Sequence, residues 1–250
     1  AVGVGYVGYK SAQCNVLYYN PSQTYLSPKK ADGSLFVTAA NFFAAPYAGF
    51  VSYYVTSDAV DRSSTNLSTG FQAYDSKTLR NSGTSDLPQQ AYYYVYSGTQ
   101  KLTYATAPCT DPDTGFVNGV PKATTGGTWT RVVVSTAADQ ANFAIWYSYY
   151  RTRIGLIKSA ASLAFTPLTD TFRIGFLTMQ PKDLASDSTI NQSKYLAISD
   201  FNSTQRNLWF NRLFSQIPGG ASPAREGLAR VGRMYAGQHD GINAGMPDDP

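Results

Sequence analysis

The stretch "DQANFAIWYSYYRTRIGLIKSAASLAF" (139–165), followed by "TFRIGFLTM" (171–179), decides which fold class the sequence predicts. Apolar residues in the first stretch recur every three or four positions, which predicts one long amphipathic helix over 139–165 with Asp139 at its cap. Thr166-Pro167 ends this helix, because the residue before a proline disfavours helical geometry. The second stretch is short, apolar and bounded by polar residues, as is typical of a buried strand.

Two more helices are predicted after this strand. "STQRNLWFNRLFSQI" (203–217) has Ser203 near its cap, and "IPGGASPAREGLARVGRMYAG" (217–237) contains a helix that ends at Gly237. In the second of these, Ser222 is a favoured N-cap and Pro223 suits the first helical turn. Its expected apolar face consists of Leu228, Val231, Met234 and Tyr235. A helix, a strand and two helices in this order indicate an α/β layered fold.

The composition changes near residue 137, and the residues before it favour strands and loops. "AYYYVYSGTQKLTYA" (91–105) contains two β-rich runs around Ser97-Gly98, which predicts a hairpin. "GGTWTRVVVS" (126–135) and "GFVSYYVT" (49–56) are predicted to be further strands. The sequence therefore predicts two parts, a β-rich region over 1–138 and an α/β region over 139–250.

Composition excludes two classes of partner. Only 14% of the 250 residues are charged, and the formal net charge is +4. The longest basic run is Lys29-Lys30, so the basic footprint of a nucleic-acid-binding protein is absent and no nucleic acid is expected as a partner. No apolar stretch reaches the ~18 residues that a membrane-spanning helix needs, so no membrane-spanning segment is expected.

Residues that could carry catalysis are sparse. His239 is the only histidine, no G-x-S-x-G elbow is present, and no pair of His and Cys residues has zinc spacing. We therefore expect no enzyme and assign no catalytic residue. "DPDTG" (111–115) alternates Asp111 and Asp113 as a calcium loop does, but the further ligands do not follow, so a turn is expected there.

Cys14 and Cys109 are the only cysteines. Their positions allow two independent buried thiols, or one disulfide that closes a long loop and stabilises the fold by roughly 2–5 kcal/mol. For an exported protein we favour the disulfide.

The tyrosines, 19 in all, leave two interpretations open. Tyr92, Tyr94 and Tyr96 would share one face of a strand. Stiff, amphipathic side chains in such a row could form a surface-binding strip, which also suits stacking on sugars. The alternative is that half of the tyrosines pack inward in a β-rich module and half cover its surface.

The two opening stretches resemble a signature of the PilY/PilC family of type IV pilus tip adhesins and pilus-biogenesis factors. The most specific part is the Trp-Tyr-x-Tyr-Tyr-Arg-Thr-Arg core at 146–153, and other pieces fit in order along nearly the whole chain. The resemblance implies an α/β fold, namely a partial von Willebrand factor A-like doubly wound domain. Residues 1–138 would be its large β-rich, Tyr-rich insertion, and residues 139–250 the A-domain portion, incomplete at both ends.

The resemblance also implies a divalent cation, Mg²⁺ or Ca²⁺, in the complete protein. Ser222, in Ser-Pro-Ala-Arg-Glu, matches the position of the family's threonine ligand. The family's Asp-x-Ser-x-Ser motif is missing, and its later Asp would fall after residue 250, so this chain supplies one neutral hydroxyl. Because a hard cation prefers several oxygen ligands that include carboxylates, no cofactor is expected for this chain alone.

The function that the resemblance implies is that of an extracellular adhesin and pilus assembly factor, at the pilus tip or outer cell surface and exported through the periplasm. Its partners would be minor pilins at the pilus tip and a host or abiotic surface. The first alternative is an extracellular carbohydrate-binding module that uses the Tyr-rich strands. A hydrolase built on an α/β core is a third interpretation.

Overall fold

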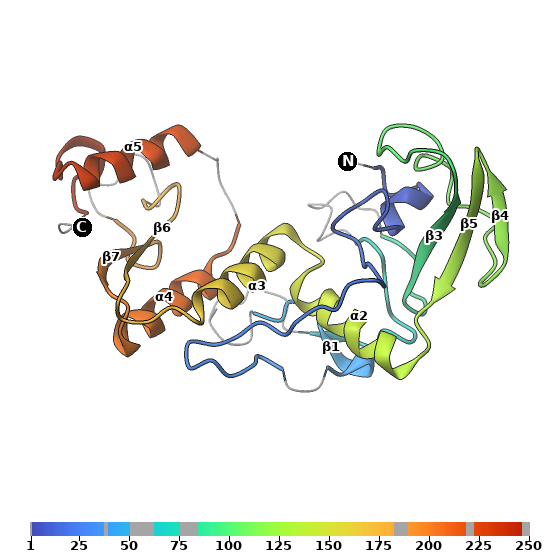
Figure 1. Cartoon of the computed structure of the whole chain (residues 1–250), viewed down its shortest axis with the longest axis horizontal. Coiled ribbons are helices and arrows are strands. Elements are labelled where there is room, and N and C mark those ends of the chain that lie inside the picture. The colour runs from blue at the N-terminus through green and yellow to red at the C-terminus, as the bar shows by residue number, and fades with distance from the viewer. Residues whose placement is uncertain are drawn as a thin grey trace. The chain divides into compact units, whose positions relative to one another are not determined.

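The computed structural model describes residues 2–37, 40–50, 63–75, 85–182, 190–218 and 223–246. Within these ranges the fold is mixed α/β (Figure 1). The chain forms two compact units. The first comprises Ala1–Ser27, Val37–Gly49 and Asp61–Ile157, and the second comprises Pro28–Phe36, Phe50–Val60 and Lys158–Pro250. These units do not coincide with the predicted parts 1–138 and 139–250, because the helix that follows residue 136 packs within the first unit.

The main sheet of the first unit is antiparallel and has the strand order β3-β5-β4. Its strands are β3 (Tyr92–Gly98), β4 (Pro121–Thr124) and β5 (Gly127–Val133). The strand predicted over 126–135 is thereby confirmed. The hairpin predicted around Ser97-Gly98 is wrong, because β3 pairs with the distant β5 and places Tyr96 opposite Trp129, with 5.1 Å between the ring centroids. Such a cross-strand aromatic pair stabilises long-range pairing over a local turn.

Smaller elements complete the first unit. They are the 3₁₀ turns η1 (Val7–Lys10) and η2 (Phe42–Ala44) and the short antiparallel pair β1 (Ala45–Pro46) and β2 (Ser64–Thr65). Of the strand predicted over 49–56, residues 51–56 lie outside the described residues.

The long helix predicted over 139–165 is two helices, α2 (Ala137–Tyr149) and α3 (Arg153–Phe165). Thr136, rather than Asp139, caps α2, since its hydroxyl accepts a hydrogen bond from the Asp139 backbone N–H at 3.2 Å. The interruption has a similar cause. The Thr152 hydroxyl accepts from the Gly155 backbone N–H at 3.1 Å and so provides a second N-cap inside the predicted helix.

Aromatic side chains from α2 form the core of the first unit. The Phe143 ring lies 4.7 Å from the Tyr19 ring and 5.3 Å from the Phe71 ring, measured between centroids. Trp146 contacts Phe143 from one turn along the same helix, at 4.9 Å. Large aromatic rings from α2 and from the N-terminal loops are buried against one another in this core. Helix α2 therefore holds those loops against the sheet.

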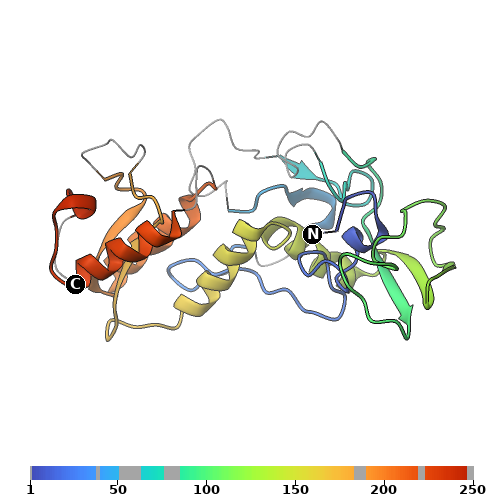
Figure 2. The same cartoon turned by 90° about the horizontal axis from the view of Figure 1, so that it is seen from above.

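The second unit is built on an antiparallel ribbon of β6 (Arg173–Leu177) and β7 (Tyr195–Asp200). Helix α4 (Ser203–Ser215) packs on it, and the Gln205 side chain donates hydrogen bonds to the backbone oxygens of Ile174 and Ala197, at 2.8 and 2.7 Å. Helix α5 (Ala224–Tyr235), followed by η3 (Gly241–Asn243), packs through Met234 against Tyr195. Figure 1 shows α4 and α5 on opposite sides of this ribbon, and Figure 2 shows the same elements from above.

Three local predictions in the second unit need comment. The strand over 171–179 exists as β6, but its apolar residues are half-buried rather than buried, because the described ribbon has only two strands. Helix α4 begins at Ser203 as expected, capped by the Asn202 side chain. The residue at the cap position of α5 is Pro223, and Ser222 lies outside the described residues.

The face of α5 that packs inward differs from the predicted one. Met234 is buried as expected, but Leu228 and Tyr235 are 75% and 67% exposed. Gly227 and Arg230 are the other buried residues of this helix. The prediction counted apolar residues, whereas close contact with the backbone at Met179 favours a glycine at position 227. In the described ranges, no helix has both the length and the apolar character needed to cross a bilayer.

Candidate functional site

The structure places Tyr92, Tyr94 and Tyr96 on one face of β3, as predicted, but that face is covered. The three residues are 2%, 4% and 6% exposed. Turn η1 packs over β3, and the loop that contains Cys109 lies beside η1, since the Gly8 N–H donates to the Cys109 backbone oxygen at 3.1 Å. The three tyrosines therefore do not form the exposed strip that a surface-binding site requires.

The disulfide between Cys14 and Cys109 is present, with 5.9 Å between the Cα atoms. It joins the N-terminal segment to a loop 95 residues later in the sequence. Of the two arrangements that the sequence left open, the structure has the covalent one. This bond fixes the N-terminal segment to the loop that lies beside η1.

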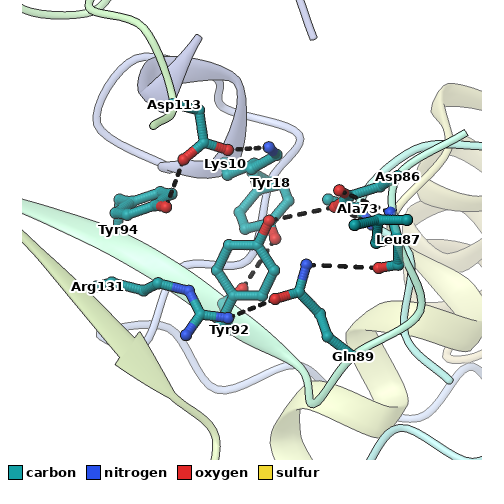
Figure 3. Close-up of polar contacts among 10 residues, drawn as sticks. All are labelled: Lys10, Tyr18, Ala73, Asp86, Leu87, Gln89, Tyr92, Tyr94, Asp113 and Arg131. Carbon is teal, nitrogen blue, oxygen red and sulfur yellow. Dashed lines mark hydrogen bonds and ion pairs between the residues drawn. The ribbon is translucent and has the colours of Figure 1, made fainter. Parts of the chain in front are cut away.

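Polar side chains meet beneath this cover and form what we call the β3 cluster, shown in Figure 3. Its members come from η1, the N-terminal loop, two further loops and strands β3 and β5: Lys10, Tyr18, Asp86, Gln89, Tyr92, Tyr94, Asp113 and Arg131. The Asp113 carboxylate forms an ion pair with Lys10 and accepts a hydrogen bond from the Tyr94 hydroxyl at 2.5 Å. Lys10 is only 3% exposed, so its charge depends on this carboxylate for compensation.

A second carboxylate, Asp86, closes the other end of the β3 cluster. It accepts hydrogen bonds from the Tyr92 hydroxyl at 3.2 Å and from the Leu87 backbone N–H at 3.0 Å. The Tyr18 hydroxyl donates to the Tyr92 backbone oxygen at 2.8 Å, on the edge of β3 away from β5. Gln13 binds that edge as well, because its side-chain amide both donates to and accepts from the Tyr96 backbone, at 3.1 and 2.7 Å.

Arg131 on β5 covers the same tyrosines from the neighbouring strand. Its guanidinium carbon lies 4.2 Å from the centre of the Tyr92 ring, and its Nη2 donates to Gln89 Oε1 at 2.6 Å. A cation over an aromatic face is attracted by the ring quadrupole. Arg131 lies directly opposite Tyr94 in the strand register, which is the placement that permits this contact.

The electrostatics of the β3 cluster keep the tyrosines neutral. Burial, with smaller effects from Tyr18 and Asp86, holds the pKa of the Tyr92 hydroxyl well above its usual value. Burial and the hydrogen bond to Asp113 likewise raise the pKa of Tyr94. Each hydroxyl therefore remains a hydrogen-bond donor at neutral pH. The arrangement suits a fixed internal network that holds loops against a sheet. Neither the Tyr92 nor the Tyr94 hydroxyl has the lowered pKa that would activate it as a nucleophile.

The signature core at 146–153 has a related role within the first unit. The Trp146 indole N–H donates to the Leu17 backbone oxygen at 3.0 Å, and the Tyr150 hydroxyl donates to the Leu26 backbone oxygen at 2.7 Å. Arg151 donates to the Tyr47 backbone oxygen at 2.6 Å. Its guanidinium also stacks over the rings of Tyr47 and Tyr147, at 4.1 and 4.4 Å. The residues that carry the family resemblance are thus those that bind the backbone of distant loops.

A metal site is not assembled by the described residues. Asp113 is engaged by Lys10 and Tyr94, His239 is exposed in a loop, and Ser222 lies outside the described ranges. In the part of the chain that the structure describes, no group of three or more His, Cys, Asp or Glu side chains is placed to hold a metal ion. The described donor set therefore does not fit the implied cation.

Three curated relatives are similar to this chain along most of its length, and each is a type IV pilus biogenesis factor PilY1 from Pseudomonas aeruginosa. The protein of strain PAK is 30% identical over 254 residues, which cover 95% of this chain and 19% of the relative. The protein of strain UCBPP-PA14 is 29% identical over 232 residues, which cover 90% of this chain and 18% of the relative. The third, from a further strain, is 28% identical over 262 residues.

This chain thus spans about a fifth of the length of the curated relatives it matches, 19% and 18% for the first two. No protein-family model matches it. No solved structure matches it either. The predicted resemblance to pilus biogenesis factors is confirmed by the named relatives.

Proposed function

We propose that this chain is a segment of a PilY1-like type IV pilus biogenesis factor and that it acts by binding proteins and surfaces rather than by catalysis. The observation that carries the proposal is similarity over 95% of the chain to a protein named for that role. A disulfide fits export to an oxidising compartment. We therefore assign the protein to the cell exterior, at the pilus tip or outer surface, after passage through the periplasm.

The proposed partners are minor pilins at the pilus tip and, on the outward side, a host or abiotic surface. The internal networks support a binding role, because a rigid support lowers the entropy that a binding surface loses on association. The β3 cluster binds loops of the first unit to β3, and the disulfide joins the N-terminal segment to the loop that contains Cys109. Loops held in this way can present a fixed surface without regular secondary structure.

We also propose that the second unit is part of a von Willebrand factor A-like doubly wound domain, into which the β-rich, Tyr-rich region is inserted. Helices α4 and α5 lie on opposite sides of the β6–β7 ribbon, as helices cover both faces of such a sheet. An antiparallel pair is common at the edge of a doubly wound sheet. In the complete domain, Ser222 would contribute one oxygen ligand to a divalent cation, and every carboxylate ligand would come from outside this chain.

A segment exchange tests the proposal. The matching segment of PilY1 in Pseudomonas aeruginosa is replaced by this chain, and twitching motility and surface pili are compared with those of the parent and of a strain lacking PilY1. We expect the exchange to retain both. Gly5→Ala and Gly8→Ala versions serve as a matched pair, because a methyl group at Gly8 would lie 2.4 Å from the Cys109 oxygen, whereas Gly5 has nothing within 4 Å.

The expected pattern is retention with Gly5→Ala and loss with Gly8→Ala. An exported, disulfide-bonded exchange protein that supports neither motility nor pili would contradict the proposal. Detection of the chain by surface labelling, with its disulfide intact, separates that outcome from a failure of folding or export.

A further inference from the structure

The outward face of α5 carries apolar side chains that nothing in the described part of the second unit covers. Leu228 and Tyr235 are 75% and 67% exposed, although large apolar residues on a helix usually face a core. Gly232 lies between them on the same face, since positions four and seven residues after Leu228 share one side of a helix. A methyl group built on Gly232 would have no atom within 4 Å. The face therefore consists of two protruding side chains with a gap between them.

The flanking positions of this face are small. Ala229 and Ala236 are both exposed, one before and one after the gap at Gly232. Counting outward from Gly232, Leu228 lies four residues before it and Ala236 four residues after it. Ala229 lies three residues before it and Tyr235 three residues after it. Each large side chain thus has a small residue at the mirrored position, which is Ala229 within α5 or Ala236 at its C-cap.

This pattern is self-complementary about a two-fold axis through Gly232. If two copies of α5 pack antiparallel across such an axis, Leu228 faces Ala236 of the second copy and Tyr235 faces its Ala229. The two Gly232 residues meet at the crossing, where the absence of side chains lets the backbones approach. A two-fold interface requires a patch that matches itself in this way, with knobs opposite gaps.

Charge favours the same arrangement. Arg225, in the first turn of α5, is exposed and makes no hydrogen bond or ion pair with the described residues. A cation at a helix N-terminus is unfavourable for its own helix dipole but favourable beside the C-terminus of another helix. Antiparallel packing places Arg225 next to the C-terminal end of the second copy's α5. Asp240 lies near that end; its carboxylate forms an ion pair with Arg233 of its own chain, and its side chain is 87% exposed.

We propose that the face formed by Arg225, Leu228, Ala229, Gly232, Tyr235 and Ala236 is a homodimer interface, and that its occupant is the α5 helix of a second copy of this chain. One helix face per copy buries little area, so the dimer is weak and transient. The proposal does not depend on the proposed pilus function.

Cysteine cross-linking tests the two-fold axis directly. Both natural cysteines are held in the disulfide, so an introduced thiol is the only free one. Gly232→Cys places the thiols of the two copies at the axis. Ala224→Cys is the matched control, because it is exposed on the same helix but would be separated from its counterpart by about 24 Å in the antiparallel pair. Under mild oxidation, Gly232→Cys should form a covalent dimer at least about tenfold faster than Ala224→Cys.

Equal rates for the two variants would overturn the proposal, because they would reflect random collision or another geometry. Sedimentation analysis of the unmodified chain provides the second measurement. We expect concentration-dependent association that Leu228→Glu abolishes, and since Leu228 is exposed, this substitution should leave the fold unchanged. A chain that stays monomeric at all concentrations, or whose Leu228→Glu variant still associates, would refute a second copy as the occupant. Coverage of this face by another protein would give that monomeric result.

Discussion

A buried lysine in the second unit makes stability depend on pH in a direction that can be stated in advance. Lys158 is 5% exposed, and its ammonium donates to the backbone oxygens of Phe214 and Gln216 at 2.8 and 2.6 Å. Phe214 lies in the last turn of α4, so the ammonium caps the negative end of that helix. Burial nevertheless dominates and lowers the pKa of Lys158 from 10.5 to about 8.

The sign of this pH dependence follows from the number of protons that the folded and unfolded chains bind. Between pH 8 and 10.5 the unfolded chain retains a proton on Lys158 that the folded chain releases, so the free energy of unfolding rises with pH across this window. At about 1.36 kcal/mol per pKa unit, the complete window corresponds to about 3 kcal/mol, of which about 2 kcal/mol should appear between pH 8 and 10. Lys158→Met removes the titrating group, so the variant should lack this rise.

The assay must report on the second unit alone. Guanidinium titrations at several pH values from 7 to 10, each followed by a short deuterium pulse and mass spectrometry of peptides from α4, give the free energy of unfolding of that helix. Lys101→Met, at an exposed position of the first unit, controls for the loss of one positive charge. A difference between the parent chain and Lys158→Met that stays constant with pH, or that changes with the opposite sign, would refute the reasoning.

Four further predictions concern the first unit and the helix break. By thermal unfolding, Gly8→Ala should destabilise by about 1–3 kcal/mol because of its 2.4 Å clash, whereas Gly5→Ala should stay within about 0.5 kcal/mol of the parent. By urea unfolding, Thr152→Val should cost about 1 kcal/mol through loss of the α3 cap, and Thr152→Ser should restore most of it. Arg151→Lys should lose about 1–3 kcal/mol, because an ammonium cannot stack on two rings and also bind the loop backbone; calorimetry that shows no change would contradict this. Above pH 10, near-UV circular dichroism should show falling stability, because the folded chain keeps the Tyr92 proton that the unfolded chain loses.

Local sequence patterns predicted most of the elements after residue 137. The two failures, the α2–α3 break and the inward face of α5, both arise because the predictions relied on the pattern of apolar residues. Positions of β6, α4 and α5 follow from short apolar runs and caps that act over a few residues. The break between α2 and α3 is not indicated by periodicity, because the helical pattern of apolar residues continues through Thr152. The cap at the break is a local contact between the Thr152 hydroxyl and the Gly155 N–H, which a count of apolar residues does not register. The inward face of α5 was missed because a glycine and an arginine pack there, and no apolar count identifies such residues.

The β3 cluster could not be read from the sequence at all, since its charged members are scattered. No regular spacing in the sequence links its charged residues, which are Lys10, Asp86, Asp113 and Arg131. Strand pairing and the disulfide bring them together. Asp113 lies in "DPDTG" (111–115), where the sequence predicts a turn, and nothing in that pattern indicates an ion pair with a distant lysine. The partners of its carboxylate are the Lys10 ammonium and the Tyr94 hydroxyl rather than a metal ion.

The tyrosine strand did carry a signal against exposure. A strand with one solvated face alternates apolar and polar residues, whereas "YYYVY" (92–96) has no charged or amide side chain on either face. A strand of this kind is covered on both sides. In the structure Tyr92, Tyr94 and Tyr96 are at most 6% exposed and η1 packs against β3, while the Tyr93 ring lies 5.4 Å from the Tyr19 ring. Because the hydroxyls of Tyr92 and Tyr94 are bound to the half-buried carboxylates of Asp86 and Asp113, a sugar could stack there only if both hydrogen bonds and the disulfide-fastened cover were displaced. The physical chemistry of this strand therefore favours a fixed internal support over an exposed strip that binds sugars or surfaces.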